Sequence, residues 1–261
     1  MSKRIASVVA VLATAGLLSG CGKQPSAGCI VQDSTWIAKY NLTNGATGSC
    51  AQQPGDLLGV YKFVNPNASE AERNAGTAAR LAIRPSAAAA LTVATFRQPG
   101  ATANTTVLRR DPSGAVIAPQ SATSLSATFD NASDAEGFCA AGGFPTQVID
   151  AAEVKNSAGE TAVPATRVEY TFKNIQVFAS PSAPGTQMRG NLTFKDNACT
   201  AEYEVWALWP PVSCTPGSTV PADSCGEGSG LNPDFDVVCD EVLEECVPAR
   251  RPPSFKAGVE L

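Results

Sequence analysis

The chain lacks histidine and carries little charge, and both shortages exclude classes of function. Without an imidazole it cannot form Ser-His-Asp or Cys-His nucleophile pairs, histidine-ligated zinc or histidine-ligated haem. Charged residues make up 16% of the 261 residues, below the quarter that is usual for globular proteins. The net charge of -5 and the pI near 4.9 provide no basic stripe, so we expect no nucleic-acid partner.

Several catalytic motifs are also missing. The sequence has no Ser-x-x-Lys, Gly-x-Ser-x-Gly or Walker-type loop and no CxxC pair, so we expect no cofactor and no metal. Gly226, Gly228 and Gly230 alternate in a polar loop without a preceding strand, which indicates a linker. Glycoside hydrolysis needs only two acids about 5 to 9 Å apart. Glu202 and Glu204 share one strand face, which favours a solvated sheet surface and leaves a histidine-free glycoside hydrolase as an alternative.

The apolar run at the N-terminus is too short to span a membrane. Lys3 and Arg4 precede fourteen uncharged residues at 5–18, whereas a spanning helix needs about 20 apolar residues. Small residues follow at Ser19 and Gly20, where a signal peptidase needs room. This pattern predicts a cleavable export signal at residues 1–20.

The sequence Leu18-Ser19-Gly20-Cys21 resembles the lipobox of bacterial lipoproteins. The resemblance implies cleavage before Cys21, a thioether-linked diacylglycerol on its sulfur and an N-acyl chain. Several chains give stable membrane anchoring, which one chain does not. Gly22 takes the place of the Asp that would suggest retention in the inner membrane, so similarity to the Gram-negative sorting rule implies the outer membrane, on its periplasmic face or at the cell surface. The alternative is an ordinary signal peptide followed by a chance cysteine.

The remaining cysteines are even in number. The chain has nine, and an even remainder in an exported protein predicts disulfides. The disulfide candidates are Cys29, Cys50, Cys139, Cys199, Cys214, Cys225, Cys239 and Cys246. Proximity in the sequence favours the pairs Cys29–Cys50, Cys139–Cys199, Cys214–Cys225 and Cys239–Cys246. Unpaired buried thiols and a metal cluster are the alternatives.

Short strands dominate the middle of the chain. Apolar or β-branched runs bounded by turn residues predict strands at residues 30–42, 57–64, 91–97, 105–109 and 124–129. Alternation is strongest at residues 167–172, 189–195 and 199–205. The alternation of apolar and polar residues shifts by one position at Lys173-Asn174, which predicts a β-bulge. Asp196-Asn197 predicts a hairpin turn. A helix is expected at residues 70–81, although Gly76 weakens it.

These patterns predict an all-β fold, either an antiparallel β-sandwich or a partly open barrel, with a disulfide-rich, loop-rich C-terminal appendage. We divide the chain into a signal peptide (1–20), a lipid anchor and tether (21–28), a β-sandwich-like domain (29–209) and a tail rich in cysteine, proline and glycine (210–261).

The tail differs in composition from the domain. From residue 210 onward it has nine acidic and three basic residues, and we expect disulfides rather than a core to hold it. Arg250-Arg251-Pro252-Pro253 is expected to begin a disordered end. An acidic disulfide loop is the main interpretation, with calcium as an alternative. The acids concerned are Asp234, Asp236, Asp240 and Glu241.

The remaining hypotheses concern partners. Trp206 and Trp209 could stack on a sugar, although core or sheet-edge packing is expected for them, as for Trp36. Residues 239–248 resemble Cys-Asp-x(n)-Cys-Val loops of myxobacterial surface proteins, and together with the leader they make the chain resemble myxobacterial-type outer-membrane lipoproteins. We expect a lipid-anchored envelope protein with a structural or interaction role and no catalysis. Its partners would be the membrane, through the lipid on Cys21, and an envelope protein or polysaccharide, with a carbohydrate-binding module as an alternative.

Overall fold

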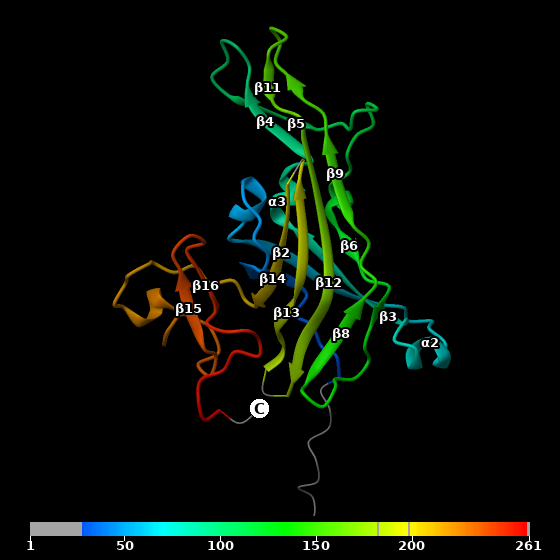
Figure 1. The fold of residues 1–261 in the computed structure, drawn as a ribbon, viewed down its shortest axis with the longest axis vertical. Helices are drawn as coiled ribbons and strands as arrows, with labels where there is room; N and C mark the ends of the chain where they lie inside the picture. The colour runs from blue at the N-terminus through cyan, green and yellow to red at the C-terminus, as the bar shows by residue number, and fades with distance from the viewer. Residues whose placement is uncertain (1–27, 182, 198, 260–261) are drawn as a thin grey trace, which may run out of the picture.

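A curled antiparallel sheet forms the body of the protein (Figure 1). The computed structural model describes residues 28–181, 183–197 and 199–259, so Cys21 and the expected signal peptide lie outside the described residues. Within these ranges, ten strands pair in the order β6-β3-β2-β1-β14-β13-β12-β8-β7, and β9 also pairs with β12. The strands are β1 (Ser34–Leu42), β2 (Gly55–Val64), β3 (Ala79–Pro85), β6 (Ser124–Leu125), β7 (Thr128–Phe129), β8 (Phe138–Gly142), β9 (Gln147–Ala151), β12 (Thr166–Ser180), β13 (Ala183–Asp196) and β14 (Cys199–Leu208).

One short segment joins the two edges of this sheet. β6 pairs with β3 through Ile83 and Ser124, and β7 pairs with β8 through Phe129 and Ala141. Because β6 and β7 are consecutive in the chain, residues 124–129 contact both edges and turn the sheet into a partly open barrel. The interior is filled by side chains that alternate along the strands, as in small barrels. The expected fold class is confirmed.

The longest strand follows the predicted pattern. Val168, Tyr170 and Phe172 of β12 point inward, and inward packing resumes at Ile175 after a register shift opposite β13. Asn174 has a φ of 52° at this bulge. The hairpin at Asp196-Asn197 is also confirmed, because Asp196 pairs with Cys199.

The predicted helix at residues 70–81 is wrong beyond its first turn. α2 spans Glu70–Asn74 and begins with a capping box between Ser69 and Glu72. Gly76, at a φ of 69°, follows its end, and the next residues enter β3 because Leu81 and Ile83 fill the barrel interior. No helix in the described ranges is long and apolar enough to cross a membrane.

The barrel has two different ends (Figure 1). The α2 end carries α2, the β7–β8 and β12–β13 connections and the start of the described chain. The hairpin end carries the β4 (Val93–Arg97)–β5 (Asn104–Leu108) hairpin and the β10 (Val154–Lys155)–β11 (Thr161–Val163) hairpin. It also carries α3 (Ser86–Ala90), η1 (Ser49–Gln52) and η2 (Pro119–Ala122). β12, with 15 residues, spans about 50 Å at about 3.3 Å per residue.

The C-terminal segment packs on the outer face of the barrel, which corrects the expectation of a tail without a core. It contains η3 (Pro221–Ser224) and the hairpin of β15 (Val237–Asp240) and β16 (Glu245–Pro248). Phe235, Val247 and Phe255 of this segment cover outward-facing side chains of the barrel. The covered barrel residues are Ile37, Phe138, Phe178 and Leu208. The expected disorder from Arg250 onward is also wrong, because Arg251 pairs with Glu204 and Arg189 donates to the Pro252 carbonyl at 3.0 Å.

Candidate functional site

All eight disulfide candidates are paired, but each pairing expected from sequence proximity is wrong. The bonds are Cys29–Cys139, Cys50–Cys199, Cys214–Cys239 and Cys225–Cys246. The two barrel disulfides join cysteines 110 and 149 residues apart. For Cys50–Cys199 the sheet is the reason, because it places β2 and β14 on either side of β1. Cys29–Cys139 instead joins the chain before β1 to β8, across the interior of the curled sheet.

Cys29 fixes the start of the fold to the α2 end. It is 2% exposed and bonded to Cys139 of β8, and its carbonyl accepts a hydrogen bond from the Lys62 ammonium at 2.5 Å. A Cβ added to Gly185 would lie 2.2 Å from the Ile30 carbonyl oxygen, so the segment before β1 packs tightly on the start of β13. The described chain therefore enters the fold at this end.

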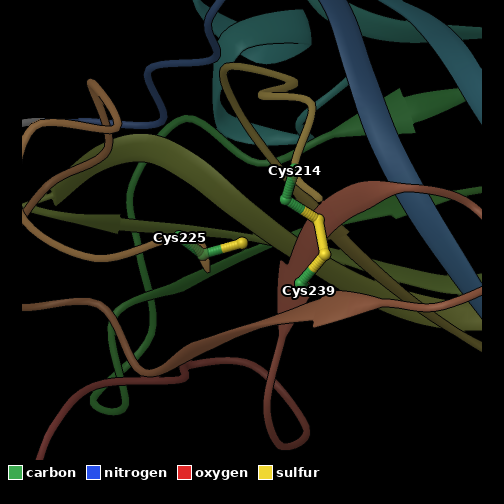
Figure 2. A group of neighbouring side chains, drawn as sticks. All are labelled: Cys214, Cys225 and Cys239. Atoms are coloured by element: carbon green, nitrogen blue, oxygen red, sulfur yellow. A yellow bond between two sulfur atoms is a disulfide. The ribbon is translucent and has the colours of Figure 1, made fainter. Parts of the chain in front are cut away.

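A group of three sulfurs has the spacing of a metal site but not its chemistry (Figure 2). The Sγ atoms of Cys214, Cys225 and Cys239 lie within 4.8 Å of one another, the one such group of potential ligands in the described ranges. Cys214 is bonded to Cys239, and Cys225 to Cys246. A metal needs thiolates, so these two neighbouring disulfides staple the C-terminal segment instead.

The predicted acidic groups are divided among different basic partners. In the tail, Asp236 pairs with Arg250 at 3.5 Å and Asp240 with Lys39 of β1 at 2.9 Å. Desolvation works to raise the pKa of Asp240, but hydrogen bonds from Lys39 and two backbone N–H groups hold that pKa below its usual value.

The remaining acids take separate roles as well. The carbonyl oxygen of Asp234 accepts a hydrogen bond from the Lys256 N–H at 2.9 Å, while Glu241 is exposed. On β14, Glu204 pairs with Arg251 and Glu202 is exposed. The ion pairs favour structural roles for Asp236, Asp240 and Glu204.

The tryptophans are covered rather than displayed. Trp36 is fully buried and donates through its ring nitrogen to the Gln32 carbonyl at 2.8 Å. Trp206 is half-buried, and its ring nitrogen is buried without a hydrogen-bond partner. Trp209 is half-buried and packs against the barrel core. The expected core or sheet-edge packing therefore applies to Trp36 and Trp209, and Trp206 lies half-buried on β14.

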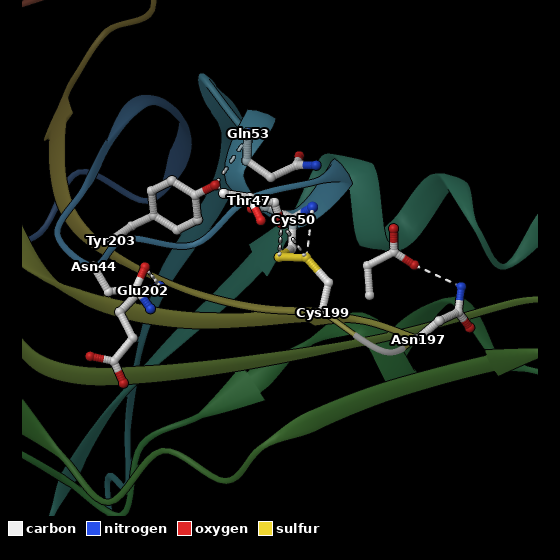
Figure 3. Close-up of a disulfide and its surroundings, with 9 residues drawn as sticks. Asn44, Thr47, Cys50, Gln53, Asn197, Cys199, Glu202 and Tyr203 are labelled. Atoms are coloured by element: carbon white, nitrogen blue, oxygen red, sulfur yellow. Dashed lines mark hydrogen bonds between the residues drawn. A yellow bond between two sulfur atoms is a disulfide. The ribbon is translucent and has the colours of Figure 1, made fainter.

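The hairpin end holds a buried polar cluster (Figure 3). The Cys50–Cys199 disulfide ties η1 to β14, and the Tyr203 hydroxyl donates to the Cys50 carbonyl and accepts from the Gln53 N–H. This network closes the barrel beside η1.

Next to it, Asp56 of β2 holds α3. Its carboxylate accepts hydrogen bonds from the Ala87 N–H at 3.1 and 3.3 Å, and burial raises the pKa of Asp56 to about 6. Burial, and then the charge of Asp56, raises the pKa of Tyr40, whose buried hydroxyl has no hydrogen-bond partner. This cluster can take up a proton in mild acid.

Arg109 fastens the two hairpins to the barrel. It is 2% exposed and follows β5 directly. Its Nη2 donates to the carbonyls of Ala151, Ala152 and Pro164 at 3.1, 2.9 and 2.7 Å. Burial lowers the pKa of this guanidinium, which binds three carbonyls that border the β10–β11 hairpin.

An exposed apolar patch lies at the α2 end, and the sequence reasoning missed it. Tyr61, Phe63 and Val64 of β2 are 43%, 58% and 59% exposed, and Phe63 pairs with Arg80 of β3. We call these four residues the α2-end patch. The sequence signal was the pair of aromatics two residues apart, but their parity alone does not tell which face of β2 is covered.

Comparison with known proteins gives a family for this arrangement. The MlpA family model matches residues 34–210, the stretch from the start of β1 to just beyond β14. A protein of Myxococcus xanthus that bears the name "Putative lipoprotein MlpA" is 37% identical over 270 residues, which cover 98% of this chain and 100% of that protein. No solved structure matches.

Proposed function

Because the chain belongs to the MlpA family and is a lipoprotein of the myxobacterial type, we propose that it is a lipid-anchored envelope protein with a structural or interaction role and no catalysis. The lipid is attached to Cys21 in this proposal, and Gly22 directs the protein to the outer membrane.

The observation that carries the proposal is the position of Cys29. The covalent chain from Cys21 to Cys29 reaches at most about 28 Å, at about 3.5 Å per residue. The Cys29–Cys139 disulfide holds the end of that tether at the α2 end. Since β12 alone spans about 50 Å, the α2 end lies near the membrane and the hairpin end projects away from it.

The hairpin end is the part we propose to meet a partner. Val107 and Leu108 of β5 and nearby Val116 are 37%, 53% and 46% exposed. Exposed apolar side chains on a rigid scaffold are typical of protein contact surfaces, and Arg109 fixes the base of this scaffold. An envelope protein is the partner that this chemistry favours.

Intact mass of the protein purified from its own membranes tests the anchor. We expect the mass of residues 21–261 plus acyl chains, with no cysteine alkylated before reduction and eight alkylated after it. A Cys21→Ser variant is the control and should lack the acyl mass and leave the membrane fraction. An unlipidated wild-type protein in the membrane fraction would contradict the proposal.

A further inference from the structure

We propose that the α2-end patch docks on the lipid bilayer, so that the barrel is held against the membrane by its own side chains as well as by the tether. This inference rests on the proposed lipid anchor at Cys21. It identifies Tyr61, Phe63, Val64 and Arg80 as a membrane-contact site.

The position of the patch relative to the tether supports the bilayer as its occupant. Lys62 lies between Tyr61 and Phe63 in the chain, and its ammonium binds the carbonyl of Cys29, the residue at which the tether joins the fold. Because successive side chains of a strand point to opposite faces, the patch aromatics and Cys29 lie on opposite faces of β2 but at the same end of the strand. A membrane within about 28 Å of Cys29 lies within reach of the patch, whereas β5, whose last residue is Leu108, is at the opposite end of the barrel (Figure 1).

The chemistry of the patch also fits a bilayer interface. Phe63 and Val64 provide apolar side chains, Tyr61 combines a ring with a hydroxyl, and Arg80 can extend its guanidinium to lipid phosphates. The patch borders two shallow hollows of about 340 and 370 Å³, which meet at Phe63. Glu72 lines the second hollow, and its carboxylate accepts hydrogen bonds from the Ser69 N–H and hydroxyl.

The described part of the C-terminal segment covers other apolar parts of the outer surface of the barrel but does not cover the patch. The C-terminal segment covers the outer face of β1 and β14 through Ile37 and Leu208. Its Leu243 reaches β2 at Gly55, so the cover stops at the other end of the strand from Phe63. Tyr61 and Phe63 thus continue this apolar outer face without cover, and Val64 follows them at the end of the strand. The bilayer supplies that cover without another protein.

Depth-dependent fluorescence quenching tests the docking. Lipidated Phe63→Trp protein is reconstituted into vesicles of phosphatidylethanolamine and phosphatidylglycerol that contain brominated acyl chains. The wild-type signal of the three native tryptophans is subtracted. We expect at least a twofold loss of the added fluorescence, and no loss for the control Leu108→Trp at the hairpin end.

Each outcome decides the proposal. Equal, negligible quenching at positions 63 and 108 would overturn docking. Added fluorescence at position 63 that depends on protein density but not on bromine would also overturn it, because a second copy would then be the occupant. A lipidated mass without quenching of the Phe63→Trp variant would refute this inference and leave the proposed anchor intact. A lack of acyl mass would refute the anchor itself.

Discussion

Replacing Asp56 by asparagine should make the protein more stable at neutral pH. The carboxylate is largely enclosed, and burial raises its pKa from 3.8 to about 6 despite hydrogen bonds from the N-terminus of α3. The folded protein therefore binds a proton that the unfolded chain releases between these pH values. Stability from this group is fully present below pH 3.8 and is lost as the pH rises through about 6.

The magnitude follows from that rise in pKa. Each pH unit corresponds to about 1.4 kcal/mol, so an ionised Asp56 lowers the free energy of unfolding by about 3 kcal/mol at most, and by about 1 to 3 kcal/mol when its partial exposure is allowed for. The groups facing it are Tyr40 and Tyr170, with Asp196 beyond Tyr170. Burial raises the pKa of both tyrosines, so they remain neutral throughout this range.

Urea unfolding of the Cys21→Ser protein, with and without Asp56→Asn, measures the effect. Comparing the two proteins at each pH cancels the titration of all other carboxylates. The variant should be more stable by about 1 to 3 kcal/mol at pH 7.5 and equal to the parent at pH 3.8. A variant that is less stable at both pH values would refute the reasoning, because the hydrogen bonds to Ala87 would then outweigh the burial of charge.

Two further substitutions test the packing of the barrel. A Cβ at Gly190 would lie 2.4 Å from the Ile175 side chain and 3.1 Å from backbone, so Gly190→Ala should lower the free energy of unfolding by about 1 to 3 kcal/mol. Gly45→Ala, whose added Cβ meets nothing within 4 Å, is the control in the same urea assay. Equal stability of the two variants would contradict the tight approach at Gly190. Phe255→Ala should lower the free energy of unfolding by about 3 to 5 kcal/mol and speed proteolysis of the C-terminal segment. Val242→Ala, at a residue that is 73% exposed, should change neither. An unchanged cleavage rate for Phe255→Ala would show that the C-terminal segment does not depend on the barrel.

Sequence patterns predicted the parts of the fold that depend on neighbours along the chain. The alternation of Val168, Tyr170 and Phe172 and the slip at Lys173-Asn174 correspond to β12 and its bulge. β3 was missed although Leu81 and Ile83 alternate with arginines, because the helix-forming residues just before it extended the predicted helix too far.

Features that depend on the closed sheet could not be predicted. Cys50 pairs with Cys199 because β2, which follows Cys50, and β14, which begins at Cys199, lie on either side of β1, and no spacing rule reveals this. The packing of Phe255 on the barrel could not be predicted either, because an isolated aromatic residue in a loop is not part of an alternating hydrophobic pattern. Phe63 is exposed because the C-terminal segment, up to its last described residue, does not extend over that end of β2. The α2-end patch therefore emerged only from the structure.

The pairing of β1 with β14 also sets an order of events in time. The chain is made from its N-terminus, so β1 must wait for its second neighbour until most of the domain has been synthesised. Cys50 likewise waits for a partner 149 residues later, and pairings this remote fold slowly. During that interval the edge of β1 that pairs with β14 is open to wrong partners, so the newly made protein depends most on chaperones before β14 arrives.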